Sequence, residues 1–343
     1  MSTQFVNQAA WQTAANTKPL KVGPGPDQSN PASDEVVIKV EYVAINPSEW
    51  KMQDFNYLPL QFPHVLGSDV AGIVVKTGDA VTRFKDGDRV IGHCLGLMFG
   101  GARHGGFQHY TTCREIVVAK VPDSVPLESA VVLPLGLSTS ITGLFEILKL
   151  DLPTSSNAEK KGKTVLIWGG SSSMGSTAIQ LAVAAGYDVV STASKRNHEY
   201  VKDLGAQEVF DHTDPEVVEK ISGRLQGFDV AGICDSIGEE SSIRACAAIL
   251  SSLGGGIFST VLWPPNDLPE NVNAIMVYAS NPGLVPDHVG ITVWRDFVES
   301  GLRTGALRAK PEPRVLTGGL DVVQDALELQ KKGVSAKKIV VRM

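Results

Sequence analysis

Residues 164–175 read TVLIWGGSSSMG, residues 176–186 continue with STAIQLAVAAG, and residues 188–196 read DVVSTASKR. An apolar strand thus runs into a glycine- and serine-rich turn, then a helix of small residues, then a second strand that ends in hydroxyl and basic side chains. This order is typical of a βαβ unit that binds a dinucleotide, because the turn lets phosphates approach the backbone N–H groups of the helix N-terminus. The stretch predicts a nicotinamide cofactor site.

The turn departs from the usual G-x-G-x-x-G pattern at one position. Gly170 and Gly175 serve the expected geometry, whereas Ser172 takes the place of the middle glycine. A degenerate turn of this kind also occurs in ordinary strand-to-helix connections, so the turn alone leaves both interpretations open. The residues expected to surround the pyrophosphate are Gly170, Ser171, Ser172, Ser173, Met174 and Gly175.

The end of the second strand favours NADPH over NADH. An NAD site carries an acidic residue about 20 residues beyond the glycines, where it binds the ribose hydroxyls. Ala193 holds that place here, and Ser194, Lys195 and Arg196 follow it. A hydroxyl and two cations can bind a 2′-phosphate through charge-assisted hydrogen bonds. Taken singly, Lys195 and Arg196 are equally compatible with solvated charges at the start of the next helix.

Length and composition describe a two-domain α/β protein. A chain of 343 residues is long enough for two domains that each bury a core. The chain is 43% hydrophobic and 20% charged and contains 34 glycines, which is typical of a soluble globular protein. Its formal net charge is −6 and no basic stripe is present, so nucleic acid is not expected as a partner.

No segment predicts export or membrane insertion. The first eight residues, MSTQFVNQ, lack a basic stretch followed by an apolar core, so we expect a cytoplasmic protein. The most apolar stretch, 131–148, is interrupted by hydroxyl side chains and a glutamate, and we interpret it as a buried helix rather than a membrane span. The four cysteines form no C-x-x-C pair and are expected to be buried free thiols.

The pattern of predicted secondary structure changes at about residue 127. Residues 35–120 contain short β-rich runs separated by turn residues, which predicts an all-β, barrel-like region. Helices then alternate with apolar strands, which predicts a parallel sheet covered on both faces. The tail, with a final strand at 338–342, is expected to return to the first domain. The strand expected at 272–279 is a natural pairing edge, and the oligomeric state stays open.

Several short motifs resemble the medium-chain dehydrogenases/reductases, specifically their zinc-free quinone-oxidoreductase and enoyl-reductase branch. They are LGSDVAGIV at 66–74, GDAVTRFKDGDRV at 78–90, GGFQHY at 105–110, KVPDS at 120–124 and the nucleotide turn itself. The resemblance implies a GroES-like β-barrel catalytic domain at 1–126 and 281–343, and a Rossmann NADPH-binding domain at 127–280. It also implies an active site in the cleft between the two domains.

The resemblance implies that no metal is bound. Zinc-dependent members place a cysteine after an early strand and a histidine in a Gly-His-Glu triplet, where this chain has NPSEW at 46–50 and GSD at 67–69. The cysteine-rich lobe that holds a structural zinc is missing between Cys94 and Cys113. The histidines at 93, 104 and 109 lie in one glycine-rich stretch and are not expected to converge on a metal. Alcohol oxidation is therefore not the expected reaction.

The strings AINPSEWK at 44–51 and GLSTS at 136–140 are most similar to fungal trans-acting enoyl reductases that partner polyketide synthases, the lovastatin enoyl reductase type. The resemblance implies that NADPH donates hydride to the β carbon of an α,β-unsaturated acyl thioester, with donors stabilising the enolate. It implies that Lys51 orients cofactor or thioester and relays a proton, and that Thr139 holds the carboxamide or the nicotinamide ribose, with Ser48 as a weaker candidate. From residue type alone, Lys51 is a solvated lysine and Thr139 a polar residue within a helix.

Three further residues are candidates for cofactor binding, each with a structural alternative. His212 would contact the adenosine phosphate, or it would lie on a surface loop. Asp235 would border the cofactor groove, or it would cap the following turn. The backbone at Thr260 would touch the nicotinamide. The function expected first is an enoyl reductase supplied by a synthase carrier domain. A free-standing quinone oxidoreductase or 2-alkenal reductase, and an NADPH-binding protein without catalysis, remain alternatives.

Overall fold

The computed structural model describes residues 6–156 and 158–343, which form two compact units. The first unit comprises Met1–Leu135 with Glu312–Met343, and the second comprises Gly136–Pro311. The division expected from the sequence, at 126/127 and 280/281, stays a proposal about functional domains. The compact units differ from it because residues 127–135 pack on the first unit and residues 281–311 on the second.

The first unit is built on a seven-stranded sheet in which β3 (Glu35–Ala44) pairs with three neighbours. The strand order is β15-β16-β3-β5-β6-β8, and β7 also pairs with β3; a small sheet has the order β2-β1-β4. The other strands and helices are β1 (Gln8–Gln12), β2 (Lys21–Pro24), α1 (Pro47–Phe55), β4 (His64–Val65), β5 (Asp69–Thr77), β6 (Arg89–His93), η1 (Gly101–His104), β7 (Tyr110–Arg114), η2 (Glu115–Val117), β8 (Val118–Lys120), α2 (Leu127–Ala130), β15 (Glu312–Thr317), η6 (Gly319–Val322), α11 (Val323–Lys331) and β16 (Lys337–Arg342).

Alternating apolar residues explain why β3 lies at the centre of this unit. Val36, Ile38 and Val40 belong to one hydrophobic core that also contains side chains of β5, β16 and α11. The same core includes Met52 from α1, so the helix is anchored to the sheet by its apolar face. The β-rich first domain expected from the sequence is confirmed.

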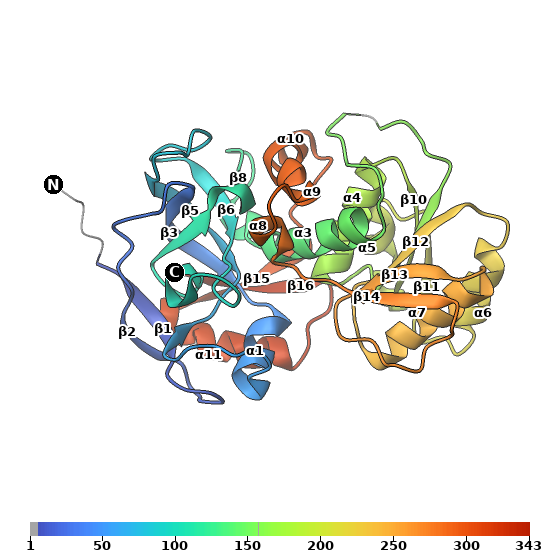
Figure 1. The fold of residues 1–343 in the computed structure, drawn as a ribbon, viewed down its shortest axis with the longest axis horizontal. Helices are drawn as coiled ribbons and strands as arrows, with labels where there is room; N and C mark the ends of the chain where they lie inside the picture. The colour runs from blue at the N-terminus through green and yellow to red at the C-terminus, as the bar shows by residue number, and fades with distance from the viewer. Residues whose placement is uncertain (1–5, 157) are drawn as a thin grey trace. The chain divides into compact units, whose positions relative to one another are not determined.

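The second unit contains a six-stranded parallel sheet in the order β11-β10-β9-β12-β13-β14. Strands β10, β12, β13 and β14 of this sheet are labelled in Figure 1. The strand order is that of dinucleotide-binding folds. Its elements are α3 (Pro134–Ile141, whose first residues lie in the first unit), η3 (Thr142–Ile147), β9 (Thr164–Trp168), α4 (Ser173–Ala184), β10 (Asp188–Ala193), η4 (Lys195–Asn197), α5 (His198–Asp203), β11 (Glu208–Asp211), α6 (Val217–Leu225), β12 (Val230–Asp235), α7 (Glu240–Ser252), β13 (Gly256–Thr260), β14 (Val272–Met276), α8 (Asn281–Leu284), α9 (Val289–Thr292), η5 (Val293–Phe297) and α10 (Val298–Thr304). The expected Rossmann sheet is confirmed, with β14 at its edge.

Both faces of this sheet are covered. Leu166 and Trp168 of β9 pack in a core with residues of α6 and α7. Val165 and Ile167, which point to the opposite face because strand side chains alternate, are fully buried as well. A strand buried on both faces reads as a continuous apolar run, which is why TVLIW could be recognised in the sequence.

The apolar helix at Leu127–Ile147, formed by α2, α3 and η3, is long and apolar enough to cross a membrane by length and composition alone. Its most apolar window is 78% buried inside the protein, however. The prediction of a buried core helix is confirmed. Its last turn is a π-helix, Thr142–Ile147.

Candidate functional site

The turn between β9 and α4 is tied to the neighbouring strand by its own backbone. The N–H of Gly169 donates to the Thr192 hydroxyl at 2.9 Å, and the N–H of Gly170 donates to the Thr192 carbonyl at 2.9 Å. Gly169 has φ +80°, a conformation that favours glycine. The Ser172 hydroxyl caps α4 by accepting the N–H of Gly175 at 3.0 Å. The turn therefore presents the N-terminus of a twelve-residue helix at a fixed place.

Close approach explains the glycine at position 175. A Cβ there would lie 2.2 Å from the Gly169 carbonyl oxygen and 2.8 Å from the Gly170 Cα. Only glycine lets the first turn of α4 lie directly against the end of β9. The result is a cradle of backbone groups and small side chains at a helix N-terminus, which fits the pyrophosphate of a dinucleotide.

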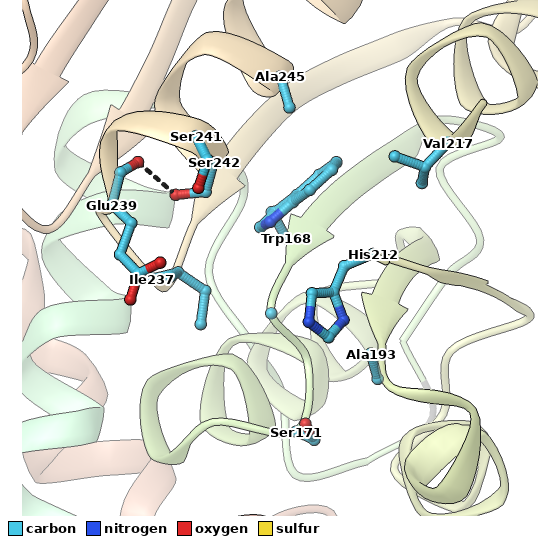
Figure 2. A pocket seen from close by; sticks show the side chains of 11 residues that line it. Trp168, Ser171, Ala193, His212, Val217, Ile237, Glu239, Ser241, Ser242 and Ala245 are labelled. Carbon is cyan, nitrogen blue, oxygen red and sulfur yellow. Dashed lines mark hydrogen bonds between the residues drawn. The ribbon is translucent and has the colours of Figure 1, made fainter. Parts of the chain in front are cut away.

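A cavity of about 410 Å³ opens beside this turn. The residues that line it come from the carboxyl ends of β9, β10, β11 and β12 and from the starts of α6 and α7, the edge of an α/β sheet where ligands bind. They are Trp168, Gly169, Ser171, Ala193, His212, Val217, Ile237, Glu239, Ser241, Ser242 and Ala245. Figure 2 shows the Trp168 ring among these side chains, with Ser242 of α7 on one side and Val217 of α6 on the other.

The cavity brings together part of the predicted cofactor set. Ser171 and His212 both line it, as does Ala193, which ends β10. Lys195 and Arg196 follow in η4 and are exposed. Asn197 is buried and donates to the Ser171 hydroxyl at 3.3 Å, so the segment after β10 is attached to the nucleotide turn.

Asp235 and Thr260 do not line this cavity. The Asp235 carboxylate is fully buried and accepts the backbone N–H groups of Ile237 and Gly238 and the hydroxyls of Ser242 and Thr260. Burial raises the pKa of this carboxyl, and its hydrogen bonds act in the opposite direction. The structure thus supports the alternative in which Asp235 holds the turn after β12, and it gives Thr260 a side-chain role in the same network.

Sequence reasoning missed several residues of the cavity. Gly169 directly precedes the glycine that matches the dinucleotide pattern, although a Gly-Gly pair directly after a strand is a signal for a positive φ. Trp168 reads as one more apolar strand residue. The remaining residues lie at the start of α6, on α7 and just before α7, where no local pattern indicates a ligand; they are Val217, Ile237, Glu239, Ser241, Ser242 and Ala245.

Helix α3, which carries Thr139, is attached to the nucleotide turn. The Ser140 hydroxyl donates to the Met174 carbonyl at 3.0 Å, and the Ser138 hydroxyl accepts the indole N–H of Trp294 at 3.2 Å. Thr139 lies between these two buried serines and is itself partly exposed. Met174 lies in the first turn of α4 and is 7% exposed.

Helix α1 carries the other two predicted catalytic residues. Lys51 is partly exposed, and its ammonium lies 5.8 Å from the centroid of the Trp50 ring. The Ser48 hydroxyl oxygen is covered and has no hydrogen-bond partner among the residues that the structure describes. Neither feature by itself assigns a catalytic role.

The segments 46–50 and 67–69, where zinc-dependent relatives were expected to carry ligands, meet in the first unit. The Asn46 amide donates to the Asp69 carboxylate at 2.9 Å, and the Glu49 carboxylate accepts the N–H of Ser68 at 3.0 Å. The ammonium of Lys338 lies 3.1 Å from Asp69, so a cation of the chain neutralises this carboxylate.

Metal-ligating side chains do not gather within residues 6–156 and 158–343: no group of three or more His, Cys, Asp or Glu residues there could hold a metal ion. The three histidines considered above are separately placed. Burial lowers the pKa of His93 to about 4, and His104 instead contacts Glu35 at 2.7 Å. His109 is only partly buried. The four cysteines are free and buried, as expected.

Comparison with known proteins gives matches over both units. Residues 32–123 match the family described as "Alcohol dehydrogenase GroES-like domain", and residues 173–279 match the family described as "Zinc-binding dehydrogenase". Trans-enoyl reductase himH of Aspergillus japonicus is 49% identical over 340 residues, which covers 99% of this chain and 98% of that protein. Trans-enoyl reductase tndF of Aspergillus flavipes is 35% identical, covering 95% and 96% of the two chains.

A solved structure supports the same fold. The crystal structure of an alcohol dehydrogenase superfamily protein from Novosphingobium aromaticivorans matches with a TM-score of 0.77 at 25% identity, covering 98% of this chain and 99% of that one.

Proposed function

Because the chain belongs to the medium-chain dehydrogenase/reductase superfamily, we propose that it is an NADPH-dependent, zinc-independent enoyl reductase that acts in trans with a polyketide synthase. The observation that carries this proposal is the 49% identity, over nearly the whole chain, to a trans-enoyl reductase. The substrate is an α,β-unsaturated acyl thioester, presented by a carrier domain of the synthase. The reaction takes place in the cytoplasm.

A bound nicotinamide cofactor would supply the hydride that adds to the β carbon of the substrate. The chain itself supplies the place where the cofactor lies. The N–H groups at the start of α4 bind the pyrophosphate, and the cavity beside Trp168 and His212 takes the adenosine. Lys51 orients the thioester or the cofactor and delivers a proton, and Thr139 holds the carboxamide or the ribose.

The absorbance of NADPH tests this function. Purified protein is given a crotonyl or 2-methyl-enoyl thioester in one series and a simple quinone in another, each with and without a metal chelator. Thioester turnover that survives the chelator supports the proposal. Turnover of quinones or small enals alone would instead identify the protein as a detoxifying reductase. Tight NADPH binding without turnover of any substrate would favour the non-catalytic alternative.

The preference for NADPH is proposed from the end of β10. Ala193 offers no carboxylate to repel a 2′-phosphate, and Lys195 and Arg196 follow it on an exposed turn that is attached to Ser171 through Asn197. A hydrogen bond to a charged group contributes about 1.5–3 kcal/mol. This segment is therefore suited to bind the additional phosphate of NADPH.

The double variant Lys195→Ala/Arg196→Ala is expected to raise the dissociation constant of NADPH by about tenfold or more, because about 1.4 kcal/mol corresponds to a factor of ten. NADH binding should change by less than about twofold. Fluorescence titration of the two cofactors measures both constants. As a control, Lys202→Ala/Lys220→Ala removes two other cations of this unit and should leave both constants unchanged. Equal weakening of NADPH and NADH by the first variant would show that these cations do not recognise the phosphate.

A further inference from the structure

Four polar side chains form a buried cluster in the first unit: Asn46, Glu49, Asp69 and Lys338. Asn46 and Lys338 are 3% and 4% exposed, and the two carboxylates are fully buried. Lys338 contacts both Asp69 and the Asn46 side-chain oxygen. Burying charges is costly unless they are paired and hydrogen-bonded, so a cluster of this kind requires a reason.

Asp69 is the hub of the cluster because its two oxygens have different partners. Its Oδ2 accepts the Asn46 amide at 2.9 Å and faces Lys338, whereas its Oδ1 accepts the backbone N–H of Leu135 at 2.6 Å. Asn46 immediately precedes α1, and Leu135 lies in the first turn of α3. One carboxylate therefore contacts the N-terminal ends of two helices, where a negative charge is favourable.

Glu49 fixes α1 from inside its first turn. Its carboxylate accepts the N–H of Asn46 and the N–H of Ser68, the residue before Asp69. Burial and the nearby Asp69 raise the pKa of Glu49 to about 7, while Lys338 acts in the opposite direction. The start of α1 is thus bound both to the hub and to the backbone beside it.

We propose that Asp69 is a positioning residue for the reaction: it fixes the first turns of α1 and α3, the helices that carry Lys51 and Thr139. Asp69 acts through the helix ends, by its contacts with Asn46 and Leu135, and not on the substrate. Lys338, from the last strand of the chain, is its counter-ion. This role rests on the proposed enoyl reductase function.

A double-mutant cycle between Asp69→Asn and Lys51→Ala tests the role with a 2-methyl-enoyl thioester and saturating NADPH. Asp69→Asn alone is expected to lower kcat about tenfold, because 1 Å misplacement of a group can cost up to about 10²-fold. The dissociation constant of NADPH should stay within about twofold. If Asp69 acts through the helices of Lys51 and Thr139, adding Asp69→Asn to Lys51→Ala should lower kcat by a clearly smaller factor than Asp69→Asn does in the unmodified protein.

Two further variants make the result specific. Asn46→Ser keeps a good N-cap residue and the Asp69–Lys338 ion pair but removes the hydrogen bonds of the Asn46 side chain to Asp69 and Lys338. It should show the same coupling to Lys51→Ala even if Asp69→Asn fails to fold. Asp88→Asn is the matched control. Asp88 pairs with Lys120 at 2.9 Å and directly precedes β6. This control variant should keep kcat within about twofold of the value for the unmodified protein.

The outcomes separate the two proposals. Absence of thioester turnover by the unmodified protein would overturn the proposed function and, with it, the role of Asp69. Turnover in which the losses from Asp69→Asn or Asn46→Ser multiply with the loss from Lys51→Ala would overturn the positioning role alone.

Discussion

Replacing Asp235 with alanine should lower the free energy of unfolding by about 3–5 kcal/mol, because it leaves several buried N–H and hydroxyl donors without their acceptor, each at a cost of about 1–3 kcal/mol. The carboxylate lies at the end of β12 and accepts bonds of 2.9 to 3.2 Å from two backbone N–H groups and two hydroxyls. Alanine supplies no acceptor and leaves space where water is excluded. Urea denaturation, followed by circular dichroism, measures the loss.

Two comparisons make this prediction specific. Asp235→Asn keeps one oxygen for the N–H groups of Ile237 and Gly238 and turns an amide toward hydroxyls that can accept, so its loss should be clearly smaller. Asp267→Ala removes an exposed carboxylate paired with Arg244 and should change stability little. If Asp235→Ala were as stable as Asp267→Ala, the network would not be what holds the turn after β12.

Replacing Gly175 with alanine should weaken NADPH binding about 100-fold. The added Cβ would meet two backbone atoms of the turn, the Gly169 oxygen at 2.2 Å and the Gly170 Cα at 2.8 Å, and backbone cannot move aside as a flexible side chain does. Overpacking of this kind costs about 1–3 kcal/mol, and the upper end of that range corresponds to about two orders of magnitude in affinity. Isothermal titration with NADPH measures the effect.

Gly223→Ala is the matched control for this variant. Gly223 lies in α6, and a Cβ there would meet no atom within 4 Å. Alanine favours a helix by about 1 kcal/mol over glycine, so this variant should be slightly more stable and bind NADPH unchanged. Binding of NADPH by Gly175→Ala within about threefold of the unmodified protein would show that the β9–α4 turn does not hold the pyrophosphate.

Local pattern was sufficient for the nucleotide turn. The apolar run of β9, the capping Ser172 and the close-packed Gly175 act within a few residues of one another, and a short window of sequence therefore contains the signal. The same is true of the buried helix at Leu127–Ile147, whose apolar length and interrupting hydroxyls are both local features.

Contacts between distant segments could not be read in this way. Asp235 looked like a groove residue because it ends a parallel strand, yet the hydroxyls of Ser242 and Thr260 converge on it only once α7 and β13 are packed. Lys338 looked like one charge in a final strand, but the sheet brings it to Asp69. Such pairings depend on strand order, which a single sequence shows only in outline.

Strand β16 has a consequence for how the protein is made. It contributes Lys338 and lies between β15 and β3 in the sheet of the first unit, although its residues are synthesised after the whole of the second unit. The second unit is continuous in sequence, so all of it leaves the ribosome before the first unit has all its strands. Domains usually fold in order from the N-terminus during translation. Here the second unit can fold first, and the first unit is completed only after the residues of β16 have followed it.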